Sequence, residues 1–187
     1  EGVTAEKVGK ALAAIEGNIN VYINSNGGDV FESIAIGNKL KAHAGSCTAI
    51  IEGIAASGAS AIAAMCYTVK MYPSAMQMIH QPHTCVCGNE DELRDAVEQL
   101  KKISSSFAEM YRARFSGTDA EFENVYKGDT FLTAEDCIKY GLCDEVSSTG
   151  TNAGNMMDIA ASVVAEREQR KRVLWDGIAA MLENKVE

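Results

Sequence analysis

Three observations predict that the chain folds as an α/β domain. A capped helix near the N-terminus leads into a strand of alternating polarity. Short apolar segments then alternate with segments whose apolar residues recur every three or four positions. The 187 residues are 47% hydrophobic and 23% charged, which is ordinary for a globular domain with a sizeable core. Regular alternation of strands and helices is typical of the α/β class.

The first elements are defined by caps, alternation and glycines. Residues 4–15 are expected to form a helix that begins at Thr4 as its N-cap. Apolar and polar residues alternate over residues 19–24, which predicts a half-buried strand. Residues 25–29, with two glycines, mark a turn, and residues 30–43 are expected to form the second helix.

The middle of the chain is unusually rich in residues with small side chains. Residues 47–52 read as a short buried strand. Residues 55–66 are rich in alanine, glycine and serine and predict a tightly packed helix, because small side chains let backbones approach closely. Two short strands are expected over residues 68–72 and 77–80, on either side of Pro73.

The clearest amphipathic helix lies within residues 88–115, with Asn89 as its N-cap. Shorter helices are expected over residues 120–126 and 133–140. The long helix carries an apolar stripe at helical spacing, which predicts a core or oligomer contact. The residues of this stripe are Leu93, Val97, Leu100, Ile103, Phe107 and Tyr111.

The chain is expected to comprise one domain and a C-terminal extension. Residues 1–146 form the domain, and the serine-, threonine- and glycine-rich residues 147–155 read as a linker. Residues 156–187 predict a helical tail with a charged, solvated face.

Composition excludes several classes of protein. The net charge of −9 argues against nucleic-acid binding, because phosphate neutralisation needs surplus lysine and arginine. No apolar run approaches the roughly 18 residues of a membrane span, and no secretory signal is seen. A cytoplasmic protein with reduced thiols is therefore expected. The six cysteines are Cys47, Cys66, Cys85, Cys87, Cys137 and Cys143.

A candidate catalytic constellation stands out from this background. Ser57 lies among small residues, and His80 and Asp129 follow it along the chain. A serine hydroxyl becomes nucleophilic when a histidine takes its proton and a carboxylate orients that histidine. Gly28 and Gly58 leave backbone N–H groups open to a developing oxyanion. Taken singly, each residue has a plainer reading as a packed small residue, a strand-end histidine or a turn aspartate.

Several separate blocks resemble the ClpP family of serine proteases, in order and over residues 3–146. The blocks are Tyr22-Ile23-Asn24-Ser25-Asn26-Gly27-Gly28, Ala55-Ala56-Ser57, Met78-Ile79-His80-Gln81-Pro82, Asp129-Thr130-Phe131-Leu132-Thr133-Ala134 and Tyr140-Gly141-Leu142. The resemblance implies a crotonase-like fold of stacked ββα units with a protruding handle helix. It also implies a nucleophile at Ser57, a general base at His80 and an orienting carboxylate at Asp129. Gly28 and Gly58 match the oxyanion donors.

The resemblance also implies partners. It implies a homo-oligomeric ring that cleaves protein or peptide substrates and needs no cofactor or metal. Asn26 and Gly58 depart from the proline and methionine usual in housekeeping members, and the Gly-Asp-Val after the turn resembles phage-encoded proteases of head maturation. The substrate could then be a capsid or scaffold protein. The axial-pore segment of the housekeeping proteases has no match, so docking to an unfoldase ATPase is the less favoured expectation.

Parts of the sequence also suggest three other functions. A crotonase-type acyl-CoA enzyme would use a similar Gly-Gly oxyanion hole but would not need the serine, histidine and aspartate. A catalytically idle assembly subunit would keep only its ring-forming surfaces. A zinc site at His80, His83, Cys85 and Cys87 is disfavoured, because four ligands so close in sequence converge poorly on a tetrahedron.

Overall fold

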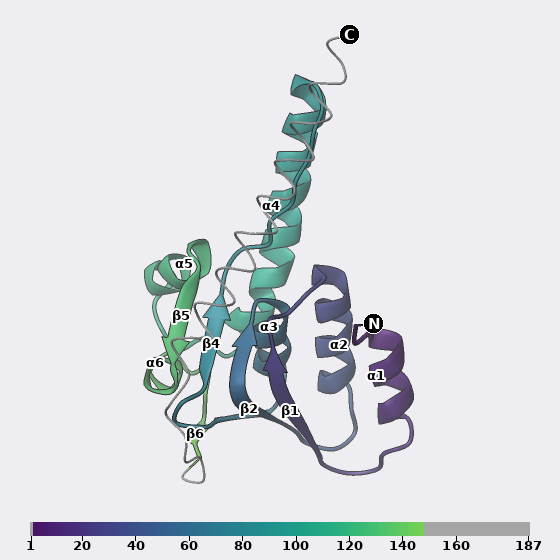
Figure 1. Ribbon diagram of the computed structural model, residues 1–187, viewed down its shortest axis with the longest axis vertical. Coiled ribbons are helices and arrows are strands. Elements are labelled where there is room, and N and C mark those ends of the chain that lie inside the picture. The colour runs from purple at the N-terminus through teal and green to yellow at the C-terminus, as the bar shows by residue number, and fades with distance from the viewer. Residues whose placement is uncertain (1, 148–187) are drawn as a thin grey trace.

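The computed structural model describes residues 2–147 as one α/β unit built around a twisted sheet (Figure 1). The predicted α/β class is confirmed. In chain order the elements are α1 (Ala5–Leu12), β1 (Ile19–Ser25), α2 (Val30–Lys41), β2 (Cys47–Ala56), α3 (Gly58–Ala64), β3 (Thr68–Met71), β4 (Met76–Ile79), α4 (Glu90–Arg112), α5 (Asp119–Lys127), β5 (Thr130–Thr133), α6 (Ala134–Lys139) and β6 (Glu145–Val146).

Strand β2 organises the sheet because it is long enough to pair with three others. Along one edge it runs parallel to β1, with Ile19 opposite Cys47. Along the other edge its first half pairs with β3 and its last residues pair with β4, both in parallel. Strand β5 joins β4 in antiparallel orientation, and β6 joins β3 in parallel. The parallel strands therefore all end on the same side of the sheet.

Helix α3 packs on β2 and β1, α2 packs beside α3, and α1 packs against α2 (Figure 1). Close packing depends on small residues, since Ala61 and Ala63 of α3 are fully buried. Gly37 of α2 serves the same purpose. A Cβ at Gly37 would stand 2.7 Å from the terminal methyl carbon of Met110 in α4 and 2.9 Å from Met65 Cγ.

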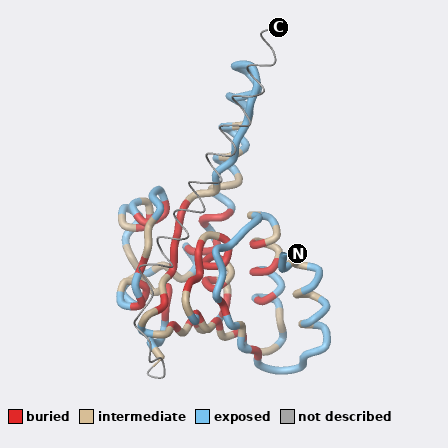
Figure 2. The backbone as a smooth tube through the Cα atoms, viewed as in Figure 1, coloured by how far each residue is buried: buried red, intermediate tan, exposed pale blue. Residues whose placement is uncertain are grey.

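Helix α4 projects far from the rest of the domain, as expected for the handle helix (Figure 1). It begins with a capping box, in which the Asn89 side chain accepts from the Glu92 N–H and the Glu92 carboxylate accepts from the Asn89 N–H. Its base is anchored by the buried Phe107 and Tyr111, whereas its outer part is exposed (Figure 2). Leu93 and Val97 of the predicted stripe are among the exposed residues.

Two predictions about local structure were wrong. Residues 55 and 56 belong to β2 and not to the following helix, because parallel pairing with β1 and β4 outweighs the helix propensity of alanine. Residues 130–133 form β5, a strand that the sequence analysis missed. The linker beyond residue 147 and the tail over 156–187 lie outside the described residues. Within residues 2–147, no helix combines the length and apolar character that a membrane span requires.

Candidate active site

Ser57 stands at a sharp turn between β2 and α3, at the end of the sheet where the parallel strands finish. Its φ is 54° and its ψ is −122°. Among residues 2–147 it is the only residue other than glycine with a positive φ. Such a backbone costs on the order of 1–3 kcal/mol and persists only where surrounding contacts impose it. The turn presents the Ser57 side chain at the top of the sheet, and strain of this kind is found at functional sites.

The loop after β1 passes unusually close to this turn. Gly27 has a φ of 87°, and a Cβ there would stand 2.5 Å from the Ala56 carbonyl oxygen and 2.7 Å from the Gly58 nitrogen. Neither the backbone conformation nor the space admits a side chain. Gly27 is therefore required by the close approach of the loop to the turn at Ser57.

His80 follows β4 directly, and parallel pairing of β4 with the end of β2 brings it beside Ser57. Its Nε2 lies 2.7 Å from the Ser57 Oγ, within hydrogen-bond distance. The imidazole is buried, with only 5% of the residue exposed. This distance suits transfer of the serine proton to the imidazole.

Asp129 is brought to His80 by the pairing of β5 with β4. Thr130 pairs with Ile79 at the end of the ladder, so Asp129 and His80, the next residue on each chain segment, lie near each other. The Asp129 Oδ1 lies 3.7 Å from the His80 Nδ1, which is longer than a hydrogen bond. The carboxylate is 44% exposed. The structure thus brings all three predicted residues together, with the serine–histidine contact shorter than the histidine–aspartate contact.

The predicted oxyanion donors also lie at the turn. A Cβ at Gly58 would stand 3.5 Å from the Gly28 backbone nitrogen, so the two peptide nitrogens share one corner of the site. The same Cβ would stand 2.1 Å from the Oγ of Ser33, a buried residue that donates to the Asp29 carbonyl oxygen at 2.7 Å. Ser33 therefore fills the space that a larger residue at position 58 would need.

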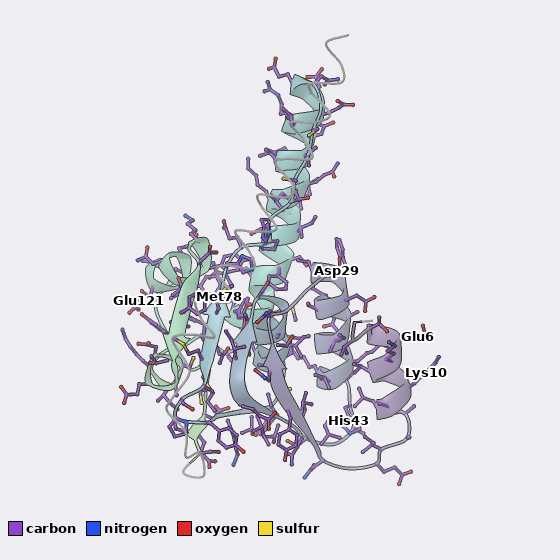
Figure 3. All side chains as sticks on the ribbon, in the orientation of Figure 1. Glu6, Lys10, Asp29, His43, Met78 and Glu121 are labelled. Atoms are coloured by element: carbon purple, nitrogen blue, oxygen red, sulfur yellow. The ribbon has the colours of Figure 1, made fainter. Side chains whose placement is uncertain are left out.

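Two further hydroxyls, of Ser60 and Tyr111, lie close to the backbone of Ser57, and the sequence analysis did not identify either of them as part of the site. The Tyr111 hydroxyl donates to the Ser57 carbonyl oxygen at 3.0 Å. The Ser60 Oγ lies 2.8 Å from that same oxygen, 2.9 Å from the Met78 carbonyl oxygen and 2.9 Å from the Tyr111 hydroxyl. The Ser57 N–H also donates to Met78, at 2.8 Å. Met78 on β4 and Asp29 at the start of α2 both lie at this end of the sheet (Figure 3).

The hydroxyl protons in this network can be assigned so that each buried carbonyl oxygen accepts a hydrogen bond. Tyr111 donates to Ser57, which leaves the Ser60 proton for Met78. Complete burial raises the pKa of the Tyr111 phenol, and the contact with the Ser60 hydroxyl offsets only part of that rise. Tyr111 therefore remains a neutral donor over the whole range in which a histidine base operates.

The loop after His80 carries the other three residues of the candidate zinc site. The exposed His83 ring lies 5.4 Å from the His80 ring, centroid to centroid. Cys85 and Cys87 are exposed thiols. Within residues 2–147 no group of three or more histidine, cysteine or acidic side chains is arranged to hold a metal ion.

Fold and site together define an α/β protein with a serine–histidine pair at a strained turn. Comparison with known proteins identifies the family. The family model "Clp protease" matches residues 4–150. The ATP-dependent Clp protease proteolytic subunit of Ligilactobacillus salivarius (strain UCC118) is 34% identical over 134 residues, which cover 70% of this chain and 68% of that protein. The chain belongs to the Clp protease family, as the resemblance predicted.

Proposed function

We propose that this protein is a serine endopeptidase in which Ser57 is the nucleophile, His80 the general base and acid, and Asp129 the carboxylate that orients His80. The observation that carries this proposal is the 2.7 Å contact between the Ser57 Oγ and the His80 Nε2 at a strained turn. Membership of the Clp protease family supports the same reaction type.

In the proposed reaction, His80 removes the Ser57 proton as the Oγ attacks the carbonyl carbon of the scissile peptide bond. The histidine then gives that proton to the leaving amine, and an acyl-enzyme remains on Ser57. Water hydrolyses the ester with the same histidine as base, which restores the free serine. Asp129 favours the tautomer with a proton on Nδ1 and stabilises the imidazolium that forms.

Backbone N–H groups of Gly28 and Gly58 are proposed to stabilise the oxyanion. Their common position at the turn beside Ser57 supports this assignment. Each such donor contributes on the order of 100–1,000-fold in rate in a known protease. Because these donors belong to the backbone, the departure from the family pattern at Gly58 removes no catalytic group.

Labelling with a fluorophosphonate probe tests the proposal directly. Native protein should be modified at Ser57, as located by peptide mapping, and the Ser57→Ala variant should be unmodified at every position. A matched control is Ser105→Ala, which changes a serine of α4 outside the proposed site and should label normally. No labelling of the folded protein would sink the proposal and favour the idle assembly subunit. Retention on immobilised coenzyme A would then favour the acyl-CoA reading.

Assembly into a homo-oligomeric ring is part of the proposal. The exposed apolar residues of α4, Leu93 and Val97, lie on a helix that projects beyond the domain and offer a surface for a second copy. The Ligilactobacillus salivarius relative is named a proteolytic subunit, which agrees with action inside an assembly. Sedimentation of the full chain should give a species several times the mass of 20.0 kDa. A monomer at micromolar concentration would contradict this part.

The biological substrate separates two versions of the function. The similarity to an ATP-dependent proteolytic subunit favours general protein processing, in the cytoplasm, with an unfoldase as partner. Maturation of a phage capsid or scaffold protein is the narrower alternative, supported by the resemblance noted in the sequence. Stimulation of protein degradation by an added Clp ATPase with ATP would favour the first version. Cleavage of a co-expressed capsid precursor without an ATPase would favour the second.

A further inference from the structure

Two cysteines meet at the opposite end of the β2–α3 unit from Ser57. Cys47 is the first residue of β2, and Cys66 follows shortly after α3. Thr48 pairs with Thr68 across β2 and β3, and Cys66 lies two residues before Thr68, in the turn between α3 and β3 near the start of β2. The two sulfur atoms are 2.7 Å apart, and only 3% of Cys47 and 4% of Cys66 is exposed. A disulfide bond is about 2.0 Å long, so a small movement would bring the sulfurs to bonding distance.

The surroundings of the pair favour thiolate chemistry. The contact with Cys66 lowers the pKa of the Cys47 thiol, although burial opposes it. The same contact, with burial, raises the pKa of the Cys66 thiol. The guanidinium of Arg114, held by Asp144 at 2.9 Å, offsets a small part of the rise in the pKa of Cys66. The 2.7 Å contact lets one sulfur, as a thiolate, accept a hydrogen bond from the other thiol, which is the arrangement of a nucleophilic and a resolving cysteine.

The pair borders a cavity in spite of its burial. Both cysteines line a cavity of about 580 Å³, together with Arg114, the exposed Tyr67 and the exposed Lys41. The other buried cysteines have a different environment. Burial raises the pKa of Cys137, and the Cys143 thiol contacts the carbonyl oxygens of Val69 and Glu145 in place of a second sulfur.

We propose that Cys47 and Cys66 form a redox-active dithiol, which a low-molecular-weight disulfide such as glutathione disulfide converts to an intramolecular disulfide. The Cys47 thiolate attacks one sulfur of glutathione disulfide and releases one glutathione thiolate. Cys66 then loses its proton and attacks the Cys47 sulfur of the mixed disulfide, releasing the second glutathione. Two protein thiols are oxidised, one glutathione disulfide is reduced to two glutathione molecules, and the two protons pass to these products.

The bond would join the two ends of the segment that carries Ser57. It would close a loop over residues 47–66, which contains all of β2, the strained turn and α3. Such a link restricts the unfolded chain and holds the strand and helix together in the folded one. The site is separate from the serine–histidine pair, so this proposal does not depend on the proposed peptidase activity.

The test uses full-length protein in which Cys85 and Cys87 are replaced by serine, which removes the exposed thiols. Folded protein is incubated with glutathione disulfide, digested without reduction and mapped by mass spectrometry. The expected product is a peptide pair linked through Cys47 and Cys66, lighter by two hydrogen atoms and separated again by dithiothreitol. The oxidised form should melt on the order of 5–10 °C higher than the reduced form.

Two controls keep the result decisive. Cys137→Ala changes another buried cysteine and should leave the 47–66 link intact, whereas Cys66→Ala should abolish both the link and the rise in melting temperature. The proposal is overturned if Cys47 and Cys66 stay reduced in folded wild-type protein under conditions that oxidise Cys85 and Cys87. A link that forms only after unfolding in denaturant would overturn it equally, and this measurement needs no variant to fold.

Discussion

The phenolic hydroxyl of Tyr111, at the base of the projecting helix α4, donates a hydrogen bond to the backbone carbonyl of Ser57 across 3.0 Å. These residues are 54 positions apart in the chain. The contact fixes the peptide on the C-terminal side of the strained residue and not its side chain. The Ser60 hydroxyl donates to the Met78 carbonyl oxygen, which also accepts from the Ser57 N–H, so two buried hydroxyls hold the turn from which the nucleophile projects.

Tyr111→Phe should lower kcat with little change in KM. The substitution removes one neutral hydrogen bond, worth about 0.5–1.5 kcal/mol, and keeps the ring and its packing. A roughly 2–10-fold fall in kcat for a fluorogenic peptide is expected. Tyr126→Phe is the matched control, because Tyr126 is another buried tyrosine whose hydroxyl donates to a backbone carbonyl, that of Ser104, at 2.7 Å. An equal loss of kcat in both variants would show a general loss of stability.

The same tyrosine should give the protein an alkaline limit of stability. Burial raises the Tyr111 pKa above its ordinary value of 10.0, so the folded protein retains a proton that the unfolded chain loses. The stabilisation is fully present below pH 10 and is lost as pH rises through the folded pKa. The free energy of unfolding can be measured by urea titration between pH 9 and pH 11 for wild type and Tyr111→Phe. Its fall with rising pH should be less steep in the variant, by up to about 1.4 kcal/mol per pH unit. Identical slopes would contradict this account.

Asp129→Asn should reduce kcat on the order of 10–1,000-fold, less than the loss caused by Ser57→Ala. In a serine protease with a buried, hydrogen-bonded aspartate the same change costs about 10,000-fold. Here the carboxylate is 44% exposed and 3.7 Å from the His80 Nδ1, so solvent screens its interaction with the imidazole. Peptide hydrolysis provides the measurement, with Asp119→Asn as an exposed-carboxylate control that should keep full activity. Loss equal to that of Ser57→Ala would mean that the contact tightens when substrate binds.

The adjacent glycines of the loop after β1 should differ sharply in their tolerance of alanine. Gly27→Ala must adopt a φ of 87° and place a Cβ 2.5 Å from a carbonyl oxygen, whereas a Cβ at Gly28 meets nothing within 4 Å. We expect Gly27→Ala to lower the free energy of unfolding by at least 1–3 kcal/mol, on the order of the cost of a strained backbone. Gly28→Ala should change it by about 0.5 kcal/mol or less. Urea titration of the pair gives the comparison, and equal values would refute the close-approach argument.

The elements that could be read from the sequence are those with local signals. Thr4 and Asn89 cap the helices they were expected to cap, and the alternation over residues 19–24 marks a real strand. Strand β5 carried no such signal. Its four residues are held by antiparallel pairing with β4, a contact that no local pattern encodes.

The candidate site divides in the same way. Ser57, His80 and Asp129 could be named from family blocks, and the structure brings them together. The hydroxyls of Ser60 and Tyr111 could not be named, because an alanine-rich helix and an apolar stripe hide polar groups that converge only after folding. Their role depends on complete burial and on partners across the sheet.

The pairing of Thr130 with Ile79 makes the histidine–aspartate contact a property of strand alignment. Side chains in a strand alternate between faces, so a slip of one residue in β5 would turn the Asp129 carboxylate to the opposite side. The chain therefore does not place this carboxylate by an adjustable loop. An insertion or deletion between α5 and β5 would act on the reaction as directly as replacing the aspartate itself, while leaving every candidate catalytic residue in the sequence.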